Sequence, residues 1–301
     1  MFLQPLPALD DPEGGLIPPK LPQVFDCHVH LFPDALFEAI WRWFDQYAWP
    51  IRYRLTAMEV IEFLTDRGIG KIAGLHYSHK PGMARQLNRH MAGLCERFPQ
   101  VIGTATVFPG ESETRAILEE GFRMGLACVK LHAHVQYFHM AGDGMHDIYE
   151  VCSEHDKPLI MHVGREPKSP VFPYERDPYS ICSAESLERV LIEYPELMVC
   201  VPHMGADEYA AYAFMLEKYD NLYLDIAMTV ADYLPDPDPP NIAKMRLDRI
   251  MYGTDFPNIP YAWDRELKRL CRMGLDARSL ELVLGGNMER FFGTTGRAER
   301  P

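Results

Sequence analysis

The chain has 301 residues, 47% of them hydrophobic, which allows a large buried core and excludes a disordered protein. The formal net charge is -13 with no dense Lys/Arg block, which argues against nucleic acid and anionic membranes as partners. Seven cysteines at irregular spacing give no disulfide framework, and neither a signal peptide nor a membrane-spanning apolar run is recognisable. We expect a cytoplasmic protein that acts on a small molecule.

Short apolar runs bounded by Gly or Pro predict eight β-strands along the chain. They cover residues 23–29, 71–77, 101–108, 127–133, 158–164, 197–203, 221–227 and 249–255. Helical patterns separate them, at residues 56–67, 83–98, 111–125, 144–155, 184–194, 207–219 and 263–273. This alternation predicts an α/β protein, a single-domain (β/α)8 TIM barrel. The alternative, an open doubly wound sheet, usually has a Gly-rich phosphate loop where this chain has "HVHLFP".

The ends of the chain differ in composition from the middle. Pro and Gly are frequent at the start, which predicts an N-terminal arm over residues 1–21. We expect the barrel domain over residues 22–295 and a C-terminal tail over residues 296–301. The Trp-rich segment "FEAIWRWF" has helical spacing and is typical of a helix-packing surface, although it could also wall a substrate pocket.

Polar residues gather at the carboxyl ends of the predicted strands. His28 and His30 lie two apart at the end of the first strand, so both side chains face the same way. The later strands end in Lys130, His132, His162, His203 and Asp255. In (β/α)8 barrels this end of the strands carries the chemistry, so these residues are candidates for an active site.

Each of these residues alone has an ordinary structural explanation. A single His after an apolar run is more often hydrogen-bonded than metal-bound, and Asp255 in "GTD" could be a helix N-cap. Their joint occurrence at one end of the barrel favours a metal site, because burying them without a counter-ion would be costly. Nitrogen and oxygen ligands suit one divalent ion, Zn first, with Mn, Fe, Co or Ni as alternatives.

Several segments together resemble a known enzyme family. They are "FDCHVHLFP", "ACVKLHAHVQ", "LIMHVG", "VPHMG", "MYGTDFP" and "GGNMERFFG", in that order between residues 22 and 293. This set is similar to the amidohydrolase-related family, the branch of the metal-dependent amidohydrolase superfamily that includes aminocarboxymuconate-semialdehyde decarboxylase-like enzymes. The resemblance implies a distorted (β/α)8 barrel with one catalytic metal.

The resemblance also implies roles for individual residues. The metal ligands would be His28, His30, His162 and Asp255. His203 and Asp255 would be the catalytic residues, with His203 beside the metal-bound water as an acid, base or electrophile.

Three residues would support this centre without binding the metal, namely Asp26, Lys130 and His132. Dinuclear members of the superfamily carry a carboxylated lysine near the position of Lys130. The branch that this chain resembles combines "KLH" at this strand with mononuclear sites, so we expect one metal.

The expected reaction is hydrolysis of an amide, ester or lactone by a metal-activated water. The alternative is non-oxidative decarboxylation of an aromatic or unsaturated carboxylic acid, which the same ligands would serve. A TatD-type nuclease and a non-enzymatic metal-binding barrel are further alternatives. Arg165 and Arg176, in a loop with several aromatic residues, suit a small anionic substrate, and His76 could also touch it. Many members of the family form dimers, so a homodimer stays open.

Overall fold

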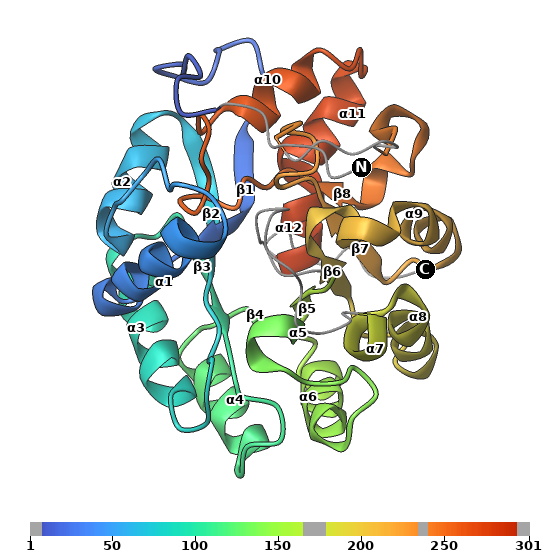
Figure 1. Cartoon of the computed structure of the whole chain (residues 1–301). Coiled ribbons are helices and arrows are strands. Elements are labelled where there is room, and N and C mark those ends of the chain that lie inside the picture. The colour runs from blue at the N-terminus through green and yellow to red at the C-terminus, as the bar shows by residue number, and fades with distance from the viewer. Residues whose placement is uncertain (1–7, 165–178, 234–239, 294–301) are drawn as a thin grey trace.

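The computed structural model describes residues 8–164, 179–233 and 240–293, and it confirms the predicted TIM barrel (Figure 1). Eight parallel strands follow one another around the sheet in sequence order. Each strand overlaps the range predicted for it. They are β1 (Val24–His30), β2 (Ile69–Leu75), β3 (Val101–Ala105), β4 (Cys128–His132), β5 (Leu159–His162), β6 (Val199–Val201), β7 (Leu222–Asp225) and β8 (Ile250–Met251).

Helices surround the strands on the outside of the barrel (Figure 1). The predicted helices are all present, as α2 (Ala57–Asp66), α3 (Ala84–Arg97), α4 (Thr114–Arg123), α6 (Asp143–Glu154), α8 (Ala184–Glu193), α9 (Tyr209–Lys218) and α10 (Arg265–Cys271). The Trp-rich segment lies in α1 (Asp34–Tyr47), where Phe37 and Phe44 are buried. The sequence analysis missed the short helices α5 (Ala133–Gln136), α7 (Tyr179–Cys182), α11 (Ala277–Glu281) and α12 (Asn287–Phe292).

Local structure explains where two of these helices begin. Thr56 and Glu59 form a capping box at the start of α2, in which each side chain accepts a hydrogen bond from the other residue's backbone N–H. Helix α9 begins at Tyr209, two residues later than predicted. The preceding 3-10 segment, Pro202–Glu208, has positive φ at several residues and cannot continue as an α-helix.

The barrel closes where β8 and the segment after it meet β1. The Cys27 backbone N–H donates to Tyr252 O at 3.0 Å, and the Asp255 N–H donates to His28 O at 2.9 Å. Gly253 is needed at this seam, because a Cβ there would lie 2.9 Å from the Cβ of His28. The seam therefore brings the end of β1 and Asp255 next to each other.

The residues before β1 are held against the start of α10. Gly14 N–H donates to Asp264 Oδ2 at 2.9 Å, and Arg265 pairs with Asp11 at 2.7 Å. The limits of an arm at residues 1–21 and of a tail at 296–301 stay predictions. Among the helices of the described ranges, none has the length and apolar character needed to cross a bilayer.

Candidate metal centre and active site

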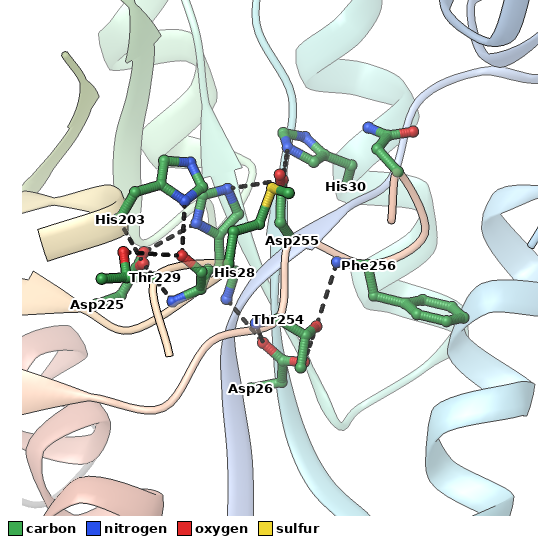
Figure 2. A network of polar contacts seen from close by, with 12 residues as sticks. Asp26, His28, His30, His203, Asp225, Thr229, Thr254, Asp255 and Phe256 are labelled. Carbon is green, nitrogen blue, oxygen red and sulfur yellow. Dashed lines mark hydrogen bonds and ion pairs between the residues drawn. The ribbon is translucent and has the colours of Figure 1, made fainter. Parts of the chain in front are cut away.

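Three predicted metal ligands meet at the seam between β1 and β8. Asp255 Oδ1 lies 2.8 Å from His30 Nε2 and 3.3 Å from His28 Nε2 (Figure 2). All three side chains are buried, and they form a group whose ligand atoms could hold one metal ion. Apart from its ion-pair contact with Asp255, the buried Nε2 of His28 makes no hydrogen bond to the described residues, as expected for an atom that would face a cation.

Asp225 is a site residue that the sequence analysis missed. It ends β7, it is buried, and its Oδ2 lies 2.8 Å from His28 Nδ1 (Figure 2). A carboxylate on the far nitrogen of a ligating His fixes the ring and its tautomer. The available signal was an acidic residue closing the apolar run "NLYLD", the same signal that identified Asp255.

The charges within this group determine its protonation. Burial lowers the pKa of His28, but the charges of Asp225 and Asp255 outweigh it and raise the pKa to about 9. Burial lowers the pKa of His30 to about 4. Burial opposes the ionisation of Asp255, but His28 and His30 hold the pKa of this carboxyl well below its usual range. Excess negative charge around His28 is the environment that a cation would neutralise.

Asp26 supports the backbone on both sides of the seam. Its Oδ1 accepts hydrogen bonds from the backbone N–H of His28 at 3.0 Å and of Thr254 at 3.2 Å. Its Oδ2 accepts one from the Thr254 hydroxyl at 2.6 Å. Burial raises the pKa of Asp26 to about 7. This carboxyl lies beneath the ligands, where the sequence analysis expected a supporting residue.

His203 is tied to the same carboxylate as His28. Its backbone N–H donates to Asp225 Oδ1 at 2.9 Å, and its ring Nδ1 lies 2.9 Å from Ala227 O. Because a carbonyl only accepts, Nδ1 carries the proton and Nε2 is left for chemistry. Burial lowers the pKa of His203. The φ angles of His203 and Asp255, 56° and 65°, lie in the left-handed region, a strained conformation that recurs at functional sites.

Six rings form a closed circuit around the barrel mouth, each within 6.0 Å of the next between ring centroids. In order around the circuit they are His30, His28, His203, His162, His132 and Tyr77. They come from the ends of β1, β6, β5 and β4 and from the segment after β2. The site is therefore walled by aromatic side chains as well as by ligands.

His162 does not join the group of ligand atoms in this structure. It is the register partner of His132 on the neighbouring strand, and the two rings stack at 3.9 Å between centroids. Its ring lies 4.8 Å from that of His203. The ligand role of His162 stays a prediction.

Lys130 is fully buried, and its Nζ has no hydrogen-bond partner in the described part of the chain. Burial lowers the pKa of this amine. These observations do not test the role of Lys130. Its supporting role and the expectation of one metal both stay predictions.

Of the three residues predicted to contact substrate, only His76 lies within the described residues. His76 is fully buried, with its Nε2 3.3 Å from Asn88 Oδ1, and burial lowers its pKa to about 3. Its contact with substrate stays a prediction. Arg165 and Arg176 lie outside the described residues.

Comparison with known families identifies the chain. The family described as amidohydrolase matches residues 25–294. The chain belongs to the amidohydrolase family. This confirms the resemblance drawn from the strand-end motifs and supports an enzyme of that superfamily. No curated protein sequence matches this amidohydrolase significantly.

Several solved structures share its fold. One is 5-carboxyvanillate decarboxylase from Novosphingobium aromaticivorans, complexed with manganese and 4-hydroxy-3-methoxy-5-nitrobenzoic acid (19% identity, 94% of this chain, 99% of that chain, TM-score 0.69). Another is 2,6-dihydroxybenzoate decarboxylase from Rhizobium (14% identity, 92% and 100% coverage, TM-score 0.63). A third is an uncharacterized TIM-barrel protein from Bordetella bronchiseptica (19% identity, 91% and 100% coverage, TM-score 0.66).

These comparisons overturn the expectation of hydrolysis. The two similar structures with a named substrate are both decarboxylases of aromatic acids. They favour the alternative reaction, for which the same ligand set serves. The motifs at the strand ends could not separate the two reactions, because the metal ligands do not depend on the bond that breaks.

Proposed function

We propose that this amidohydrolase is a metal-dependent, non-oxidative decarboxylase of an aromatic carboxylic acid. The observation that carries the proposal is the candidate ligand group of His28, His30 and Asp255, whose two His rings belong to a circuit of six aromatic rings. The likeness to decarboxylases over nearly the whole chain supports the choice of reaction. A flat aromatic acid suits a mouth walled by rings.

The donor set fits a divalent cation. His28 and His30 would present Nε2, and Asp255 would present Oδ1, with Asp225 behind His28 to orient its ring. These nitrogen and oxygen atoms are compatible with Zn or Mn, and manganese is the ion in one similar decarboxylase. A cation there would bind an oxygen of the substrate and withdraw electron density from the reacting ring.

The residues of the chain would then handle one proton. When the C–C bond to the carboxylate breaks, CO2 leaves and the electron pair stays on the ring carbon. In this proposal that carbon takes up a proton from His203, which is reprotonated from solvent. Its Nδ1 is committed to Ala227 O, so Nε2 is the atom that gains and releases the proton. No net water is consumed.

The reaction can be tested directly with the metal-loaded protein. Hydroxylated benzoates would be incubated with it in deuterated water, with CO2 and the deuterium content of the product measured. We expect CO2 and one deuterium at the carbon that lost the carboxylate. Absence of CO2 from every benzoate at one bound metal per chain would overturn the proposal.

Replacing one residue separates proton transfer from metal binding. His203→Asn should lower turnover by about 100-fold or more, because the carbon loses its proton donor, while the metal content stays at the wild-type value. Turnover that persists in this variant would remove His203 from the mechanism.

A further inference from the structure

The ring of His132, at the end of β4, is held in one orientation by a hydrogen bond to the following helix. His132 is the N-cap residue of α5, and its Nδ1 accepts a hydrogen bond from the Val135 backbone N–H at 3.4 Å. An imidazole nitrogen that accepts from an amide carries no proton. The ring proton of neutral His132 is therefore on Nε2, which has no hydrogen-bond partner among the described residues.

The backbone of His132 is fixed as well. Gln136, at the other end of α5, accepts from the His132 backbone N–H at 2.8 Å through Oε1. Its Nε2 donates to Ser78 O at 2.9 Å and to Val107 O at 2.8 Å. One buried amide thus joins the segments that follow β2, β3 and β4. Rigid support of this kind is what a binding group needs.

The position of His132 gives its free donor a target. In the circuit of six rings, His132 is opposite His28, with Tyr77 and His30 on one side and His162 and His203 on the other. An aromatic acid with one oxygen on the cation that His28, His30 and Asp255 would hold would extend across the circuit. Its far side would meet the Nε2–H of His132.

We propose that His132 is a substrate-binding residue that donates its Nε2–H to an anionic oxygen of the aromatic acid, on the side away from the metal ligands. The inference rests on the proposed function. It assigns His132 a direct contact in place of the supporting role expected from the sequence, and it makes Gln136 a positioning residue for that contact.

Two variants of His132 separate the helix cap made by Nδ1 from the proposed substrate contact made by Nε2–H. His132→Asn keeps an oxygen that can cap α5 but places no donor where Nε2 lies. His132→Gln places an amide N–H near Nε2 but removes the cap. The probes are 4-hydroxy-3-methoxy-5-nitrobenzoic acid and 2,6-dihydroxybenzoate, titrated calorimetrically into the Mn²⁺-loaded full chain, with the melting temperature of each variant as the measure of folding.

We expect the Asn variant to melt near the wild type and to bind the probes about tenfold more weakly. The Gln variant should melt at a lower temperature and keep an affinity within about threefold of the wild type. Equal binding by the wild type and the Asn variant would overturn this assignment alone. A wild type that binds neither probe would overturn it together with the proposed substrate class.

A spectroscopic measurement checks the tautomer without any ligand. In protein labelled with ¹⁵N-histidine, the His132 signal is assigned by its loss in the Asn variant, which should melt near the wild type. We expect a protonated Nε2 and an unprotonated Nδ1 in the wild type. The reverse tautomer would overturn the assignment whatever the affinities of the variants.

Discussion

The two sides of the barrel mouth use different chemistry. On the side of β1, β7 and β8, Asp225 and Asp255 lie against His28 and His30 in a buried, charged network. On the side of β4 and β5, His132 and His162 stack as neutral rings.

Under the proposed function, the comparison assigns metal binding to the first side and substrate binding to the second. Negative charge concentrated around His28 suits a cation. The close contacts of Asp225 and Asp255 there fix the orientation of the two His rings. Aromatic faces and a single free N–H suit a flat acid. Changes at Asp225 and Asp255 on the first side should therefore alter metal content. Changes at His132 and Gln136 on the second should alter substrate affinity at constant metal content, whereas His162 on that side is itself a predicted metal ligand.

The largest expected effect is the loss of a metal ligand on the charged side. Asp255→Ala removes the carboxylate that faces both His28 Nε2 and His30 Nε2. We expect the metal content to fall from about one per chain to near zero and turnover to fall by about 1000-fold or more. Elemental analysis and the CO2 assay measure the two. The control is Asp147→Asn on the exposed face of α6, which should change neither.

Asp225→Asn tests the carboxylate behind the ligands. The amide keeps the shape but removes the charge that orients His28, so metal affinity or activity should fall about 10- to 100-fold. A metal titration of the purified variant measures this loss. Wild-type affinity in the variant would mean that Asp225 is only a backbone support for His203 and Ala227.

Gln136→Leu tests the neutral side. Three buried backbone groups lose their partner, so we expect the free energy of unfolding to fall by about 3 kcal/mol in urea titrations. Substrate affinity should fall as well, while metal content stays at the wild-type value. Loss of metal in this variant would contradict the division between the two sides.

The smallest expected effect is on the pH dependence of folding stability, through Glu266. Burial raises the pKa of Glu266 to about 8, and its Oε1 accepts from the Tyr261 hydroxyl at 2.6 Å and the Met228 N–H at 3.2 Å. The folded pKa lies above the unfolded value of 4.5, so stability from this group is complete below pH 4.5 and is lost as pH rises through about 8.

Glu266→Gln keeps both accepted bonds and removes the titration. The melting temperature of the variant should therefore decline less than that of the wild type between pH 6 and pH 9. Parallel declines in the two proteins would show that Glu266 does not contribute to the pH dependence.

Much of the fold was predictable because the alternation of apolar strand runs with helical patterns can be read from short stretches of sequence. Every strand was identified from apolar runs, and the helix predicted over residues 56–67 begins at the capping box of Thr56 and Glu59. The turn after β6 was not predictable, since the left-handed angles of His203 and Met204 arise from packing around Asp225 and Ala227. Short α5 has too few residues to show a periodic pattern.

The site was partly predictable for a related reason. Position at a strand end identified His28, His30 and Asp255, but it could not show that Asp225 bonds to a ring on another strand. It also placed His132 and His162 on the same edge without revealing that their registers coincide. The expectation of hydrolysis was wrong, and decarboxylation stood only as the alternative, because ligand type alone does not distinguish the two reactions.

The seam between β1 and β8 has a consequence for the newly made protein. His28 and His30 emerge from the ribosome early, whereas Asp255 follows only after almost all of the barrel has been synthesised. A nascent chain therefore carries two of the three members of the ligand group until the segment after its last strand arrives. An ion bound there would link the first strand to the last and favour the finished barrel over every shorter intermediate.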